Sequence, residues 1–148
     1  MIEVEKMQDQ NGEQDLTEPQ TEPDVTIAVF MLSLFQIADQ AKIIHLQTDF
    51  DTEHRHFGMF YDTFTGLLDT LVEAIAGKYG TDKLKFSQAA IMVYDYETAK
   101  PVFFELVDEV LRGTFSTLFS RDKDSELFNL VDEMLDLKNK VQYLLQMK

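Results

Sequence analysis

Three side chains of types that bind metal ions lie on one predicted helix, residues 51–79: His54, Asp69 and Glu73. Fifteen residues separate His54 from Asp69, and nineteen separate it from Glu73. At about 100° of turn per residue, the three side chains share one face of the helix. At about 1.5 Å of rise per residue, however, His54 lies roughly 22 Å from Asp69 along the helix axis. One ion therefore cannot touch both residues within a single helix.

A second copy of the chain would remove this obstacle. A two-fold axis near Asp62 and Thr63 would lay an antiparallel copy of the helix alongside, so that His54 of one chain lies beside Asp69 and Glu73 of the other. Imidazole together with carboxylates forms a mixed ligand set for a divalent metal ion. The alternative is that the histidines hydrogen-bond at a turn and that the acidic pair is a solvated surface. The spacing alone leaves both interpretations open.

The same face of this helix contains two glycines, Gly58 and Gly66. Each glycine inside a helix costs about 1 kcal/mol of stability relative to alanine. Close approach of another backbone is one physical reason to place them there, which favours a helix that pairs with its own copy.

Composition narrows the function classes. The chain has 148 residues, of which 45% are hydrophobic, and it has no cysteine and a net charge of −14. One domain with a real core is expected, and disulfides, thiolate metal sites and a cysteine nucleophile are excluded. The N-terminus is polar rather than signal-like, and no apolar run approaches the roughly 20 residues of a membrane span. The acidic surface repels phosphate, so direct DNA binding is not expected.

Half of the charge is concentrated at the N-terminus. Residues 1–24 carry eight carboxylates and one lysine, a net charge of −7, among many Gln and Pro residues. Such a segment cannot bury enough apolar surface to offset the entropy of ordering. We therefore predict a disordered acidic tail over residues 1–24 and a folded domain over residues 25–148.

Apolar residues at spacings of three and four predict four long helices in this domain. The predicted ranges are 26–47, capped by Asp24 or Thr26; 51–79, capped by Asp51 or Thr52; 97–119; and 123–146. A further short helix is predicted over 87–93. The first and third links between these helices are short, whereas the link between the second and third helices is long. This is the connectivity of an all-α, ferritin-like four-helix bundle with one crossover. The first helix is apolar all round from Ile27 to Ile37, so a homodimer or larger homo-oligomer is expected to cover it.

Three short motifs carry a family resemblance: HLQT at residues 45–48, GKYG at 77–80 and NKVQYLL at 139–145. Together they resemble an uncharacterised ferritin-like family of tailed phages and large DNA viruses, over most of residues 27–147. The resemblance implies a viral origin, a helical bundle, and a location in the host cytoplasm or in the virion. It implies no established activity.

The chain also distantly resembles the Dps mini-ferritins, in which two histidines and an Asp/Glu pair meet at a two-fold interface. Carried over residue by residue, the resemblance implies a metal site formed by His45 and His54 of one subunit with Asp69 and Glu73 of its mate. The implied metal is iron, with manganese or zinc as alternatives, and the implied activity is ferroxidase-like.

Two departures from the Dps pattern favour metal binding without catalysis, and leave enzymatic activity open. Leu46 stands where that family usually has tryptophan, and Gly58 stands where an acidic residue is common. The alternative function is that of a non-enzymatic phage virion or interaction protein. Such an acidic helical module would bind other virion or host proteins, or mimic DNA, with no cofactor.

Overall fold

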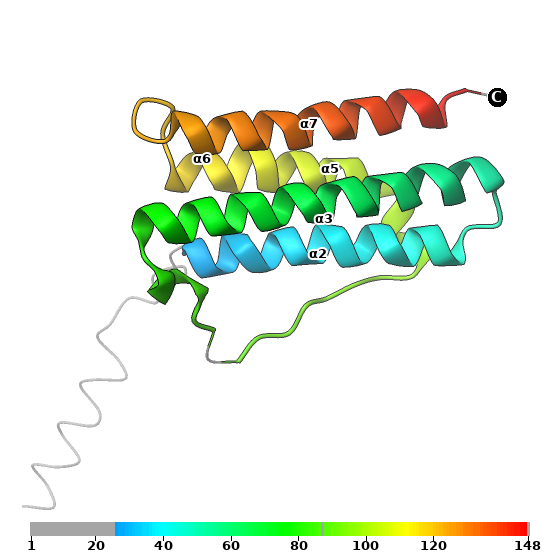
Figure 1. Ribbon diagram of the computed structural model, residues 1–148. Helices are drawn as coiled ribbons and strands as arrows, with labels where there is room; N and C mark the ends of the chain where they lie inside the picture. Colours follow the sequence, from blue (N-terminus) through cyan, green and yellow to red (C-terminus); the bar gives the residue numbers. More distant parts are fainter. Residues whose placement is uncertain (1–25, 87, 148) are drawn as a thin grey trace, which may run out of the picture.

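Four long helical segments pack side by side in the computed structural model, which describes residues 26–86 and 88–147 (Figure 1). The predicted acidic tail, residues 1–24, lies outside the described residues. Three segments are continuous α-helices: α2 (Ile27–Gln47), α3 (Asp51–Tyr79) and α7 (Ser125–Leu145). The remaining segment is a succession of short helices: α4 (Tyr96–Ala99), η2 (Lys100–Val102), α5 (Phe103–Asp108), η3 (Glu109–Thr114) and α6 (Phe115–Leu118). The predicted all-α fold is confirmed.

The connectivity is also as predicted. Short turns join α2 to α3 and α6 to α7, so these pairs are antiparallel (Figure 1). The link between α3 and α4 opens with one helical turn, η1 (Thr81–Leu84), and then runs back along the length of the bundle. A short helix was predicted over 87–93. This prediction is wrong over residues 88–93, because the described residues 88–95 contain no helix. We call residues 88–95 the crossover segment.

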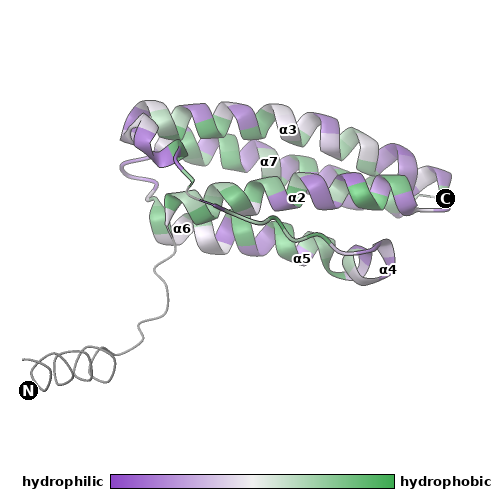
Figure 2. Cartoon of the chain, turned by 90° about the horizontal axis from the view of Figure 1, so that it is seen from below, coloured by the Kyte–Doolittle hydropathy of each residue, from purple (hydrophilic) through white to green (hydrophobic). Residues whose placement is uncertain are grey.

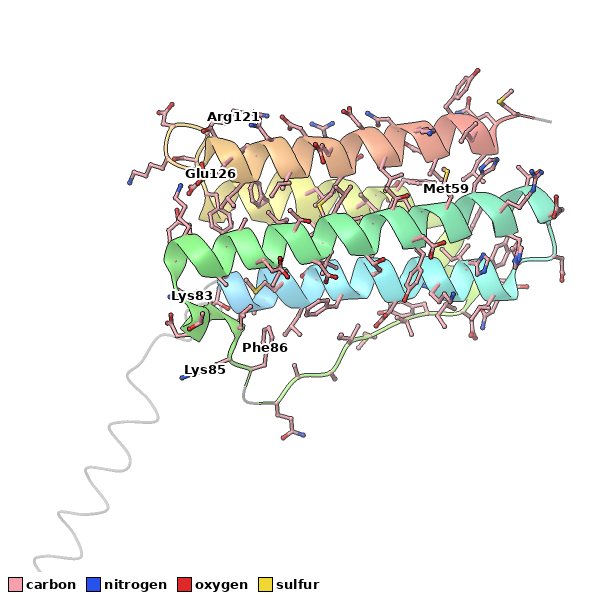
Figure 3. The ribbon with its side chains drawn as sticks, viewed as in Figure 1. Met59, Lys83, Lys85, Phe86, Arg121 and Glu126 are labelled. Carbon is pink, nitrogen blue, oxygen red and sulfur yellow. The ribbon has the colours of Figure 1, made fainter. Side chains whose placement is uncertain are left out.

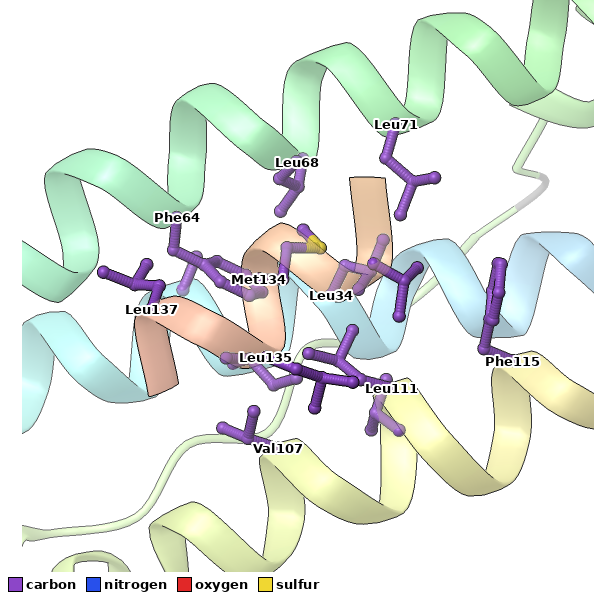
Figure 4. Close-up of a cluster of buried hydrophobic side chains, with 14 of the residues drawn as sticks. Leu34, Phe64, Leu68, Leu71, Val107, Leu111, Phe115, Met134, Leu135 and Leu137 are labelled. Carbon is purple, nitrogen blue, oxygen red and sulfur yellow. The ribbon is translucent and has the colours of Figure 1, made fainter. Parts of the chain in front are cut away.

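The core lies between the four helices. Figure 4 shows Leu34 of α2, Phe64 of α3, Leu111 of η3 and Met134 of α7 gathered in one buried cluster. On α2 the buried apolar residues recur at spacings of three and four, as one face of a helix requires: Phe30, Leu34, Ile37, Ala41 and Ile44. Each fully buried large side chain contributes about 1.5–3 kcal/mol relative to exposure. This apolar periodicity is what places the helices against one another.

The third helical segment contains a π-helix, η3, that the sequence did not predict. Val110 and Leu111 are adjacent in the chain, and both are buried. A π turn contains one more residue than an α-helical turn. The buried residues Phe103, Val107, Leu111 and Phe115 continue one face of the segment across it.

The helix ends combine one correct and one wrong prediction. The Thr26 hydroxyl accepts a hydrogen bond from the Val29 backbone N–H at 3.2 Å, so Thr26 caps α2. At the start of α3 the cap position is Phe50, and neither Asp51 nor Thr52 holds it. Thr48 stabilises this turn instead, because its hydroxyl accepts from the Phe50 N–H at 3.1 Å.

Gln40 of α2 pairs with the backbone of the crossover segment as a neighbouring β-strand would. Its amide nitrogen donates to the Tyr94 carbonyl at 2.8 Å, and its amide oxygen accepts from the Tyr94 N–H at 2.8 Å. Gln40 is only 2% exposed, and both ends of its amide are satisfied. The buried Gln40 amide therefore satisfies the backbone N–H and carbonyl of Tyr94, which lie in an extended segment that is not part of a β-sheet.

Two further glutamines on α2 extend this contact. Gln36 donates to the Met92 carbonyl at 3.1 Å, and the amide oxygen of Gln47 accepts from the Tyr96 N–H at 2.7 Å. The crossover segment consequently lies along α2, on the side that faces α5 (Figure 2). The side of α2 that carries these glutamines is thus covered by its own chain. Coverage of α2 by a second chain stays a prediction.

By length and composition, α2 also qualifies as a membrane-spanning helix among the described residues. Core helices meet the same criterion, and eight α2 residues are buried within this bundle.

A charged cluster joins α3 to α7 at the end of the bundle where Figure 3 labels Glu126. Asp124 is 2% exposed and accepts hydrogen bonds from the Tyr79 hydroxyl and from the Ser120 N–H at 3.1 Å. Lys78 Nζ lies 2.9 Å from Asp124 and 2.6 Å from Glu126. Burial raises the pKa of Asp124, but hydrogen bonds from Tyr79, Lys78 and Ser120 outweigh it, so that this pKa is lowered.

The first prediction concerns Gln40. In the variant Gln40→Leu, the Tyr94 N–H loses its acceptor, so amide hydrogen exchange at Tyr94 should accelerate strongly. Gln36→Leu is the matched control, because Gln36 binds Met92 and leaves Tyr94 untouched. Equal Tyr94 exchange in the wild type and in Gln40→Leu would contradict the pairing.

The second prediction is a pH dependence. A carboxyl group whose pKa is lowered on folding, as that of Asp124 is, stabilises the fold at pH values above its unfolded pKa, and this stabilisation is lost as the pH falls through the folded pKa. Asp124→Asn should cost about 2 kcal/mol at neutral pH and flatten the loss of melting temperature below about pH 4. Asp122→Asn, at an exposed neighbouring position, should leave the acid dependence as in the wild type.

Candidate functional site

His45 and His54 meet across the turn between α2 and α3. His45 lies in the last turn of α2 and His54 in the first turn of α3. Their rings stack with centroids 4.0 Å apart and planes inclined by 18°. His45 Nδ1 lies 2.5 Å from the His54 carbonyl oxygen, and His54 Nδ1 lies 2.8 Å from the His45 carbonyl oxygen. Each histidine thus binds the backbone of the other.

These two hydrogen bonds fix the tautomer of both rings. A carbonyl oxygen can only accept, so each Nδ1 must carry a hydrogen and donate it. In a neutral imidazole, Nε2 then keeps its lone pair. Metal-binding histidines are commonly held in this way, with the second ring nitrogen donating to a backbone carbonyl. The pair therefore has the donor atoms of a ligand set, although the same hydrogen bonds also satisfy the purely structural alternative of a turn contact.

Gly58 makes room for the His45 ring. A Cβ atom at position 58 would lie 2.9 Å from both Cε1 and Nδ1 of His45. Gly58 is therefore explained by a contact within the chain, and the idea that it serves the approach of another helix is not needed. Gly66 differs, because a Cβ there would meet nothing within 4 Å in the single chain.

Asp69 and Glu73 lie exposed on α3, far from the histidine pair. Since α3 is continuous from Asp51 to Tyr79, a single chain does not bring these carboxylates to His54. Within residues 26–86 and 88–147, no three His, Asp or Glu side chains are arranged to hold one metal ion. The four-residue site depends on a second chain and stays a prediction.

Glu53 supports the turn beside His54, a role that no local sequence pattern predicts. Its carboxylate accepts hydrogen bonds from the Thr48 hydroxyl at 2.7 Å and the Tyr96 hydroxyl at 2.5 Å, and lies 3.4 Å from Lys100 Nζ. Burial raises the pKa of Glu53, but the hydrogen bonds from Tyr96 and Thr48, with the charge of Lys100, lower it overall. An ionised Glu53 thereby ties the start of α3 to the start of the third helical segment.

The acidic residues of the last two helical segments divide into two groups. Asp108 lies 2.8 Å from Lys138 Nζ, and Asp132 lies 3.2 Å from Arg121, so these two carboxylates link structural elements. Others are exposed, as predicted for a solvated surface: Glu105, Glu109, Glu133 and Asp136.

Comparison with family models identifies the chain as a member of a family of unknown function, DUF5856, whose model matches residues 45–145. The match begins at His45 and includes His54, Asp69 and Glu73. Comparison with curated proteins and comparison with solved structures found no match.

The third prediction tests the contact between Gly58 and His45. Gly58→Ala should destabilise the fold by about 1–2 kcal/mol, because the new methyl group displaces the His45 ring, whose Nδ1 is hydrogen-bonded to the His54 carbonyl oxygen. Gly77→Ala is the matched control on α3, since a Cβ there meets nothing within 4 Å, and it should stabilise the fold by about 0.5–1 kcal/mol.

Unfolding in denaturant measures both changes. Combining Gly58→Ala with His45→Ala should remove most of the penalty, because the clashing ring is then absent. Equal stabilisation by Gly58→Ala and Gly77→Ala would contradict the contact.

Proposed function

We propose that this DUF5856 protein is a ferritin-like, Dps-like viral protein that binds a divalent metal ion at a two-fold interface between chains. His45 and His54 of one chain and Asp69 and Glu73 of the other supply the ligands, with iron as the first choice of metal and manganese or zinc as alternatives. One observation carries the proposal: the reciprocal Nδ1 hydrogen bonds leave the Nε2 lone pair of each stacked ring available.

The carboxylates supply further support. Among the described residues, no Lys or Arg forms an ion pair with Asp69 or Glu73, and both side chains are exposed. In a single chain, the histidine pair lies at the start of α3 and the two carboxylates lie nearer its end. An antiparallel α3 from a second chain would place its histidine pair beside these carboxylates. Gly66 lies between His54 and Asp69 on α3, and a Cβ atom there would meet nothing within 4 Å. This open surface suits the approach of a second backbone.

The proposal is limited to binding. The two histidines and two carboxylates form one ligand set, whose chemistry suits a single Fe(II) ion, and no residues are assigned to a second iron. We therefore assign metal binding in a homodimer or larger homo-oligomer and no oxidation step. A location in the host cytoplasm or in the virion belongs to the same proposal.

A second candidate function rests on a different observation. The crossover segment exposes a run of apolar side chains, of which Met92 is 61% exposed and Tyr94 48% exposed. A contiguous patch of exposed apolar side chains is typical of a protein–protein interface. This favours a non-enzymatic virion or interaction protein, for which metal binding would be unnecessary.

The fourth prediction separates the two candidates by subunit complementation. His54→Ala and Asp69→Ala should each abolish binding of the same metal ion in the homodimer, because each removes a ligand from both symmetric sites. After subunit exchange between the two variants, each heterodimer should regain one intact site. In that site the Asp69→Ala chain supplies His54 and the His54→Ala chain supplies Asp69. Equilibrium dialysis against Fe(II), Mn(II) and Zn(II) without oxygen measures this.

Two variants serve as controls: His56→Ala on the same helix and Asp136→Ala on α7, which lie outside the ligand set and should bind metal as the wild type does. A wild-type protein that sediments as a monomer, or that keeps its metal affinity in both ligand variants, would remove the metal proposal. The interaction protein would then be the better assignment.

A further inference from the structure

A pocket of about 220 Å³ lies between α2, the crossover segment and α5, away from the histidine pair. Gln36 and Gln40 of α2 and Tyr94 of the crossover segment form one side. Since these are the residues that join the crossover segment to α2, the pocket is a built feature of the fold. It is smaller than the roughly 300–1,000 Å³ of sites for drug-sized ligands, which indicates a small ligand.

The α5 side of the pocket is mainly apolar. Phe103 and Leu106 of α5 are buried and half-buried, and Val102, the last residue of η2, lines the pocket with 49% of its surface exposed. These side chains present hydrocarbon surface suited to an unbranched methylene chain, because burying each methylene group contributes about 0.8 kcal/mol.

Two carboxylates stand on the same wall. Glu105 and Glu109 both line the pocket and are four residues apart, so they are neighbours on one helix face. Among the described residues, no ion pair involves Glu105 or Glu109, and the two cations of the same helical segment pair with other acids: Lys100 with Glu53, and Arg112 with Asp108. Two like charges at this spacing repel each other, and a bound cation would relieve that repulsion.

The backbone is irregular at the same place. Glu109 begins the π-helix η3, and π turns inside α-helices occur frequently at functional sites. The pocket, its apolar wall, its unpaired carboxylates and this local distortion coincide. The carboxylates alone would describe a solvated surface, but here they adjoin a cavity with an apolar wall.

We propose that this pocket binds the ammonium group of a small unbranched aliphatic amine. The ammonium ion contacts Glu105 and Glu109, and the methylene chain lies against Val102 and Leu106. The inference is independent of the proposed metal site, since the two share no residue. The same chemistry is present in a free amine and in a lysine side chain, and the test distinguishes these sources.

The fifth prediction is tested with n-pentylamine hydrochloride and the full chain, by following the methyl NMR signals of Val102 and Leu106. The signals should shift in a saturable manner. The double variant Glu105→Gln/Glu109→Gln should weaken binding by at least about tenfold. The matched control Glu133→Gln/Asp136→Asn removes the same charge from exposed α7 positions and should weaken binding less than about twofold.

Neutral n-pentanol and short ethylamine separate the two halves of the site. Both should bind more weakly than n-pentylamine, because one lacks the charge and the other lacks most of the chain. Nα-acetyl-lysine-N-methylamide tests the source: tighter binding than n-pentylamine indicates a lysine side chain, and weaker binding indicates a free amine. Because all four substitutions are at exposed positions, an unchanged amide spectrum should verify the fold of each variant. No saturable shift with n-pentylamine, or equal weakening in the two double variants, would overturn the proposal.

Discussion

The exchange of hydrogen bonds between His45 and His54 is the constraint on which the α2–α3 corner depends. His45 belongs to the last turn of α2, where backbone carbonyls have no partner within the helix, and the His54 ring supplies one. The His45 ring in turn binds the His54 carbonyl and occupies the space that Gly58 leaves open. One contact thus satisfies a carbonyl in the last turn of α2, joins α2 to α3 and fixes both ring tautomers. The proposed metal site uses the lone pairs that remain.

The glutamines of α2 impose a second constraint, on the other side of that helix. They bind the crossover segment and the first residue of α4 through side-chain amides, so that an extended backbone is held against a helix without a sheet. This attachment creates the pocket above α5 and leaves apolar side chains of the crossover segment exposed. The two proposed binding surfaces therefore depend on different contacts, one at each side of α2, and either could exist without the other.

The sequence predicted the regular elements well because their apolar residues repeat at helical spacing. The range of α2 and the cap at Thr26 followed from local patterns, and the ends of α3 and α7 lay within a few residues of prediction. Contacts between distant residues were not predictable in this way. The pairing of Gln40 with Tyr94 spans 54 residues, and the extended crossover segment follows from it. The π turn was not predictable from the adjacent apolar pair Val110 and Leu111, because a similar buried pair, Phe30 and Met31, lies within the regular helix α2. For the site, spacing correctly separated His54 from Asp69 within one chain, whereas the reason for Gly58 required the position of His45.

The most direct test of this account is the protonation of the two histidine rings, read from their ¹⁵N NMR signals in the metal-free protein at mildly alkaline pH. The account predicts that both rings carry hydrogen on Nδ1 and that both Nε2 atoms give the signal of an unprotonated acceptor. Protonation at Nε2 in either neutral ring would show that the reciprocal hydrogen bonds are absent. It would also remove the lone pair on which the proposed metal site depends.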